Sequence, residues 1–139
     1  RSALMAEGDR RQLNDRVDLP GFIKSPWAWM HKAQLFVLSS IAEGSGNVLT
    51  EAMAVGTPVV STDCPSGPRE MLHHGEIAPL VPMQDSSALS EAMISTLKNP
   101  INIAKLKAAA QQYRADLAAV RYLEAMGFNL NWQSRVDGS

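Results

Sequence analysis

The sequence predicts an α/β fold in which helices cover both faces of a parallel sheet. Short apolar segments typical of strands alternate with segments of helical periodicity along most of the 139 residues. Residues 34–38 contain an uninterrupted Leu-Phe-Val-Leu run, as expected for a strand covered on both sides. Strands that alternate with helices at such short intervals predict a parallel sheet with right-handed crossovers. These patterns predict a Rossmann-like sheet with its ligand-binding loops at the carboxyl ends of the strands.

The first elements are a helix over residues 3–13 and an alternating strand at 17–19 that Pro20 and Gly21 end. A second helix is expected over 27–32, with Ser25 as its N-cap and Pro26 at its first position. Three large side chains of this helix have the spacing of core residues: Trp27, Trp29 and Met30. A membrane-interface patch and, for Trp29, a partner domain are the alternatives.

The middle of the chain predicts a helix over 47–55 that ends at Gly56, and strands at 57–61 and 78–81. Asp85 is expected to cap a helix over 86–97. From residue 101 onward the pattern predicts one long helix that stops at Gly127, with a single buried stripe formed by Leu106, Ala110, Tyr113, Leu117, Val120 and Leu123. An extended tail with Trp132 as an anchor follows.

Composition excludes several classes of protein. The 45% of hydrophobic residues can fill a core, and the formal net charge of −1 provides no basic surface for nucleic acid. The single Cys64 cannot form an internal disulfide, which agrees with a reducing compartment. Apolar runs fall far short of the roughly 20 residues that span a bilayer.

The loop before the helix at 47–55 has the composition of an anion site. Gly44 and Gly46 allow backbone N–H groups to approach a ligand closely. The N–H groups of Gly46, Asn47 and Val48, together with the helix dipole, suit a diphosphate. Glycine turns between strand and helix are also common without any ligand, so the pattern alone leaves both interpretations open.

Two carboxylates flank this loop. Glu51 lies near the helix start and can accept hydrogen bonds from both hydroxyls of a ribose, and Glu43 would then face a sugar. The helix dipole also favours Glu51 at this position without a ligand. Each part of the combination would have a role if the ligand were a nucleotide diphosphate sugar, and each also has an explanation without a ligand.

Residues 17–126 resemble the C-terminal, donor-binding domain of the retaining glycosyltransferases of group 1, or family 4, which have the GT-B fold. The signature is the pair Glu43 and Glu51 with seven residues between them, followed by Ala-Met-Ala-Val-Gly-Thr-Pro-Val-Val at 52–60. The extension at 61–72 resembles a bacterial subgroup that assembles polysaccharides, lipid-linked oligosaccharides or lipopolysaccharide of the cell envelope.

The resemblance implies roles for particular residues. Glu43 is the expected catalytic residue, contacting hydroxyls of the donor sugar, and Glu51 binds the ribose. The expected contacts to phosphate and sugar come from Gly44, Gly46, Asn47, Val48 and Leu49, and the base pocket from Gly21, Phe22, Ile23 and Lys24. The resemblance further implies a UDP-sugar donor, transfer with retention, and neither a metal nor another cofactor.

The chain starts at Arg1 without an initiator Met, which suggests a fragment of a longer polypeptide. In the family, an Arg and a Lys neutralise the leaving diphosphate, and both are expected before Arg1, as is the N-terminal acceptor domain. Residues 1–127 are therefore expected to form a donor-binding domain without its first strands, and 128–139 a C-terminal tail. Such a fragment alone is expected to be inactive.

The resemblance places the full-length enzyme in the cytoplasm, peripherally associated with the inner face of the membrane. Its partners would be the nucleotide sugar and a glycan or lipid-linked acceptor. Two alternatives stay open: a binding module without catalysis, and an interaction domain that has lost its ligand. His31, His73, His74 and Cys64 are assigned structural roles, and Arg69 either reaches back to the site loop or forms a local ion pair.

Overall fold

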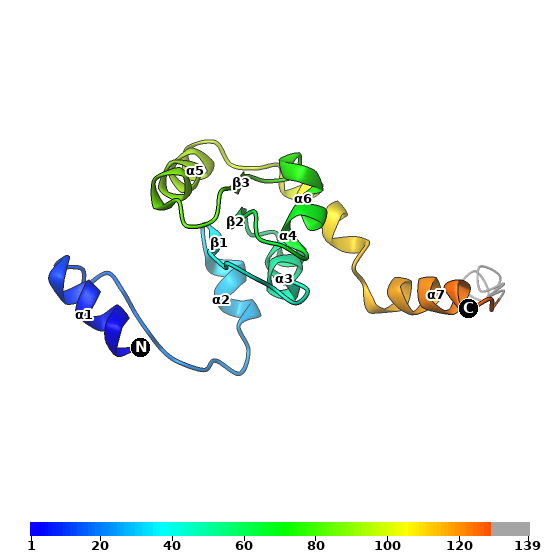
Figure 1. Ribbon diagram of the computed structural model, residues 1–139, viewed down its shortest axis with the longest axis horizontal. Coiled ribbons are helices and arrows are strands. Elements are labelled where there is room, and N and C mark those ends of the chain that lie inside the picture. The colour runs from blue at the N-terminus through cyan, green and yellow to red at the C-terminus, as the bar shows by residue number, and fades with distance from the viewer. Residues whose placement is uncertain (129–139) are drawn as a thin grey trace.

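The computed structural model describes residues 1–128 and shows a central α/β body with one helix projecting at each end (Figure 1). The body contains three strands, and helices precede, connect and follow them. In chain order the elements are α1 (Ser2–Arg10), α2 (Trp27–Lys32), β1 (Phe36–Leu38), α3 (Asn47–Val55), β2 (Val59–Thr62), α4 (Pro68–Met71), η1 (His73–Gly75), β3 (Leu80–Val81), α5 (Ser86–Lys98), α6 (Ile103–Gln111) and α7 (Ala115–Ala125).

The strands form a parallel sheet in the order β1-β2-β3, which confirms the predicted fold class. Phe36 is opposite Val59, and Ser61 is opposite both Leu38 and Leu80. Because the strands run in the same direction, the loops after Leu38, Thr62 and Val81 leave from one edge of the sheet.

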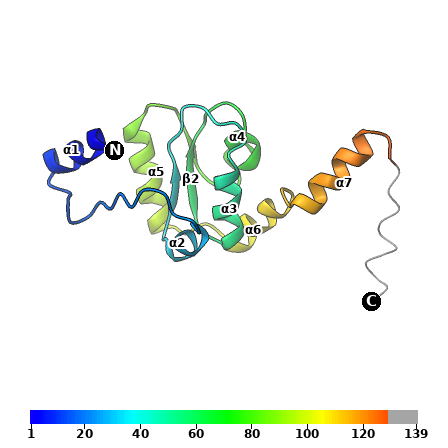
Figure 2. The same ribbon diagram turned by 90° about the horizontal axis from the view of Figure 1, so that it is seen from below.

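Helices cover both faces of this sheet. Figure 2 shows α5 on one side of β2 and α3 on the other, where α6 packs against α3. The core lies between the sheet and α3, and its fully buried side chains include Leu49, Met53, Val59, Leu72 and Leu106. This packing fixes α3, whose first turn carries the predicted site.

Local signals set the two ends of α3. Gly46 occupies the N-cap position with a left-handed backbone (φ 63°), and Gly56 ends the helix with φ 86°. The predicted helix over 47–55 is confirmed, as is the cap at Asp85, whose carboxylate accepts the Ala88 N–H at 2.9 Å. Beyond α3, the buried Thr57 hydroxyl donates to the Met30 carbonyl at 2.6 Å and ties α2 to the entrance of β2.

The predicted strand at 17–19 is wrong. The sheet formed by the described residues has β1 and β3 at its edges, and 17–19 pairs with neither. Instead Val17 and Leu19 line a hollow of about 270 Å³ together with Leu4 and Met5 of α1. Residues 17–19 thus lie beside α1, with Val17 47% exposed, and not in the sheet.

The single long helix predicted after residue 101 is also wrong. The chain leaves helical geometry at Arg114 (ψ 141°), which separates α6 from α7. Leu106, Ala109 and Ala110 of α6 are buried, whereas α7 has no buried residue. The buried stripe ends with α6, because α7 extends away from the body. The Arg114–Asp116 ion pair lies at the start of α7.

The helix α2 differs from the prediction in two details. Pro26, not Ser25, takes the N-cap position, and its carbonyl accepts the Met30 N–H at 2.9 Å. Met30 is buried as expected, but Trp27 and Trp29 are 50% and 59% exposed because α2 lies at the margin of the body.

The predicted anchor Trp132 lies outside the described residues. Among residues 1–128, none of the helices combines the length and the apolar character that crossing a membrane requires.

Candidate functional site

The loop between β1 and α3 presents the predicted anion site at the ligand-binding edge of the sheet. Gly46 is buried, whereas Gly44 and Asn47 are exposed and Val48 is half-buried. The first N–H groups of a helix have no partner within the helix, so those of Asn47 and Val48 are available to a ligand. The Leu49 N–H already donates to the Gly46 carbonyl at 2.8 Å, and a contact to phosphate would require breaking this bond.

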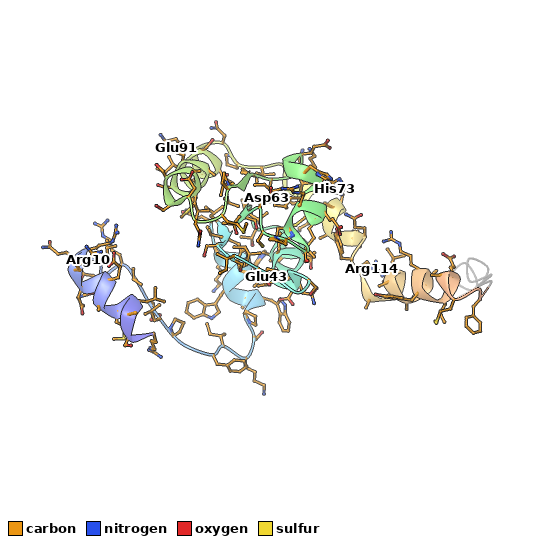
Figure 3. All side chains as sticks on the ribbon, in the orientation of Figure 1. Arg10, Glu43, Asp63, His73, Glu91 and Arg114 are labelled. Atoms are coloured by element: carbon orange, nitrogen blue, oxygen red, sulfur yellow. The ribbon has the colours of Figure 1, made fainter. Side chains whose placement is uncertain are left out.

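Glu43 lies in the same loop, three residues before the α3 N-cap. Its side chain is half-buried, and its Oε1 accepts a hydrogen bond from the Ser40 hydroxyl at 2.5 Å. Figure 3 shows Glu43 in the central body, whereas Arg10 and Arg114 mark the two outlying helices. The carboxylate therefore stands at the sheet edge where ligands of such folds bind.

Glu51 follows one turn after the start of α3. Its Oε2 accepts a hydrogen bond from the Trp27 indole N–H at 3.1 Å. This bond engages one carboxylate oxygen and gives the half-exposed Trp27 a role that the sequence interpretation missed. The signal was an aromatic residue with a polar group at the start of a short helix, which by itself does not distinguish core from site.

A cleft of about 630 Å³ opens beside Glu51, between α3 and the segment that includes α7. Burial is the main cause that raises the pKa of the Tyr113 phenol in its wall, and the negative charge of Glu70 adds to it. This phenol therefore stays neutral at physiological pH. The cleft is lined by Asn47, Thr50, Glu51, Gln112, Tyr113, Ala118, Arg121, Tyr122 and Ala125.

The predicted base pocket at residues 21–24 does not line this cleft. Gly21 has a left-handed backbone (φ 79°), and Phe22 is 93% exposed. Ile23 is half-buried and Lys24 exposed. The segment leads directly into α2, so it is connected to Glu51 through Trp27, and its contact with a base stays a prediction.

The loop after β2 packs against the loop between β1 and α3, residues 39–46, which we call the site loop. A Cβ placed on Gly46 would lie 3.6 Å from the Met71 sulfur and 3.8 Å from Pro68 Cδ. A Cβ on Gly67 would lie only 2.9 Å from the Ser45 carbonyl oxygen. The segment after β2 thus fixes the turn from which α3 begins.

An ion pair in the segment after β2 decides between the two interpretations of Arg69. Its guanidinium forms a two-pronged pair with Asp63, with Nε 2.8 Å from Oδ1 and Nη2 on Oδ2. Hydrogen bonding to Arg69 is the largest cause that lowers the pKa of the Asp63 carboxyl below its ordinary 3.8. Arg69 is therefore engaged locally, next to the loop that carries Gly67.

We expect Arg69→Gln to raise the pKa of Asp63 toward 3.8. A folded-state pKa below the unfolded value stabilises the fold above the unfolded pKa, and this contribution is lost as the pH falls through the folded one. The variant should therefore have a flatter acid limb of stability. NMR titration of the Asp63 carboxyl carbon measures the change, with Arg10→Gln as control. An unchanged pKa in Arg69→Gln would contradict the role of the pair.

Cys64 is buried at 2% exposure, in agreement with the structural role assigned to it. Within residues 1–128, no three side chains of His, Cys, Asp or Glu come together as ligands for a metal ion. The expectation of metal-free transfer stays a prediction.

These features define a class of protein: an α/β domain with a parallel sheet that matches glycosyltransferase structures of the GT-B fold. The family model described as "Glycosyl transferases group 1" matches residues 2–99. The chain belongs to this family, which confirms the resemblance found in the sequence.

Two curated relatives illustrate the similarity. A phosphatidyl-myo-inositol mannosyltransferase of Mycobacterium leprae is 43% identical over 75 residues, which are 53% of this chain and 20% of the relative. A Campylobacter jejuni N-acetylgalactosamine-N,N'-diacetylbacillosaminyl-diphospho-undecaprenol 4-alpha-N-acetylgalactosaminyltransferase is 33% identical over 87 residues, which are 63% of this chain and 24% of the relative. The chain thus spans a quarter or less of these proteins.

A solved structure supports the same relationship. The HepE protein of Anabaena, crystallised in complex with UDP, superimposes with a TM-score of 0.75 at 25% sequence identity. The match covers 91% of this chain and 35% of HepE.

Proposed function

We propose that this chain binds the nucleotide-sugar donor, a UDP-sugar, for a glycosyltransferase reaction. The observation that carries the proposal is the N-terminus of α3 at the ligand-binding edge of the sheet, with Glu43 before it and Glu51 one turn after its start. The UDP present in the HepE structure supports the choice of nucleotide. Membership of the glycosyltransferase family supports the choice of reaction.

In this proposal the chain contributes electrostatic stabilisation. The N–H groups of Asn47 and Val48 and the dipole of α3 receive the diphosphate, whose negative charge grows as the bond to the sugar breaks. Glu51 accepts the ribose hydroxyls, and Glu43 accepts hydroxyls of the sugar. Retention of configuration and independence of a metal are part of the proposal and rest on the family resemblance.

The acceptor is proposed to be a glycan or a lipid-linked saccharide. The names of the two curated relatives include an undecaprenol diphosphate and a phosphatidyl-inositol. Because the chain spans a quarter or less of these relatives, we assign it donor binding and assign acceptor binding to a longer protein. A cytoplasmic site at the membrane face belongs to the same proposal.

Calorimetric titration of the full chain with UDP, UDP-GlcNAc and GDP tests the donor site. We expect UDP and UDP-GlcNAc to bind and Glu51→Ala to weaken both by about 10- to 100-fold, because a carboxylate that accepts ligand hydroxyls is removed. Glu91→Ala is the matched control, since Glu91 is an exposed glutamate on α5, away from the site (Figure 3).

Equal binding by the wild type and Glu51→Ala would contradict the assigned site. Preference for GDP would overturn the choice of nucleotide. Absence of binding to all three ligands by the folded chain would overturn donor binding by this chain on its own.

A further inference from the structure

A chain of hydrogen bonds connects the centre of the sheet to Glu43. The Thr62 hydroxyl, at the end of β2, lies 2.5 Å from the Ser40 carbonyl oxygen. The Ser40 hydroxyl in turn donates to Glu43 Oε1 at 2.5 Å. Thr62 is only 4% exposed, and Ser40 and Glu43 are half-buried. The position of the carboxylate is thereby linked to the middle strand.

The first link lies just beyond the last paired residues of β1 and β2. β1 ends at Leu38, so the Ser40 carbonyl lies beyond the paired part of the strand. Thr62 Oγ1 also lies 3.3 Å from the Leu38 carbonyl, but a hydroxyl has one proton and the Ser40 oxygen is nearer. Because Thr62 is buried in the middle strand, its hydrogen bond fixes the position of the first residues of the site loop relative to the sheet.

The second link restricts a flexible side chain. A glutamate that is free to rotate must be ordered when it binds a ligand, and this ordering opposes binding. A hydroxyl that donates to the carboxylate at short distance forms one of the stronger kinds of hydrogen bond. Ser40 therefore orders Glu43 before any ligand arrives.

The other end of the loop lies close to the segment that follows β2. Gly67 closely approaches the Ser45 carbonyl, as described above. Residue 40 is thus held by a hydrogen bond from β2, and residue 45 lies close to Gly67, while the stretch between them carries Glu43 and Gly44. Only the first of these two approaches is a hydrogen bond, and it leads to a functional side chain through the Ser40 hydroxyl.

We infer that Ser40 is a positioning residue for Glu43, and that Thr62 positions Ser40. The inference rests on the proposed function, in which Glu43 contacts the donor sugar. It has a specific consequence: the Ser40 hydroxyl contributes to recognition of the sugar and not to recognition of the nucleotide, because Glu51 and the α3 N-terminus bind the nucleotide.

The first test requires no ligand. NMR three-bond scalar couplings of Glu43 report whether its side chain keeps one rotamer, and we expect one in the wild type and averaging in Ser40→Ala. Ser40→Thr, which keeps a hydroxyl, should restore a single rotamer, and Ser39→Ala, a change at the exposed neighbour, should have no effect. Identical couplings in the wild type and Ser40→Ala would overturn the inference.

The same measurement tests Thr62. Thr62→Val keeps the shape of the side chain but removes the hydroxyl, and we expect partial averaging of the Glu43 couplings, which Thr62→Ser should reverse. If Thr62→Val does not fold, Thr62→Ala takes its place as the variant without a hydroxyl at position 62, and Thr62→Ser stays the variant that keeps it. A single Glu43 rotamer in a folded Thr62→Val would show that the Thr62 hydroxyl does not position Glu43.

The second test compares titrations of the full chain with UDP-GlcNAc and with UDP. We expect Ser40→Ala to weaken UDP-GlcNAc binding about tenfold and to leave UDP binding within about twofold. Equal weakening of both ligands, or of neither, would overturn the positioning role. If the wild type binds neither ligand, the proposed function fails, whereas the Glu43 couplings still decide whether Ser40 orders the carboxylate.

Discussion

Replacing Leu49 with alanine is expected to lower the free energy of unfolding by about 3 kcal/mol. Leu49 is fully buried in the first turns of α3 and belongs to the core cluster between this helix and the sheet. The substitution removes apolar contacts and leaves a cavity that closely packed neighbours cannot fill. Urea unfolding followed by circular dichroism measures the loss, with the denaturant dependence unchanged if the mechanism is a cavity.

Ile94→Ala is the matched control for this change. Ile94 is 50% exposed on α5, so its truncation should alter stability by less than about 1 kcal/mol. The backbone N–H at position 49 is retained in Leu49→Ala, so at temperatures where the variant is folded its affinity for UDP should stay close to that of the wild type. A stability loss no greater than that of Ile94→Ala would contradict the central position of α3 in the core.

Elements with strong local signals were predictable from the sequence. The bounds of α3 follow from glycines that both adopt left-handed backbone geometry, and the start of α5 follows from the Asp85 cap. The parallel sheet follows from the buried apolar runs, since residues covered on both faces need no alternation. In each case the determining residues lie within a few positions of the feature that they determine.

Elements that depend on distant partners were not predictable. Residues 17–19 have the alternation of a strand, but a strand exists only where a neighbouring strand pairs with it, and here these residues share an open hollow with α1 instead. The periodicity after residue 101 continues past the point where the body ends, so it cannot reveal the break at Arg114. Periodicity describes the faces of an element and does not reveal what lies opposite.

The same distinction applies to the candidate site. The spacing of Glu43 and Glu51 marks the loop and helix, because both residues belong to one contiguous segment. Their supports come from elsewhere: Trp27 from α2 holds Glu51, and Thr62 from β2 reaches Glu43 through Ser40. Contacts between residues more than 20 positions apart become visible only when the fold is known.

Gly67→Ala is expected to lower the free energy of unfolding by about 3 kcal/mol and to weaken UDP binding. Gly67 has φ 121° and ψ −70°, a conformation open almost only to glycine, and such strain costs about 1–3 kcal/mol in other residues. The new Cβ would also lie 2.9 Å from the Ser45 carbonyl oxygen, a backbone atom that can move only with its loop. Urea unfolding and UDP titration measure the two effects.

Gly44→Ala distinguishes this mechanism from a general intolerance of the site loop. A Cβ on Gly44 meets no atom within 4 Å, so we expect a change in stability below about 0.5 kcal/mol. The strain at residue 67 acts on UDP only through displacement of residues 45–46, which immediately precede the start of α3. A Gly67→Ala variant that loses stability but keeps its affinity for UDP would therefore show that the turn before α3 does not contribute to the nucleotide site.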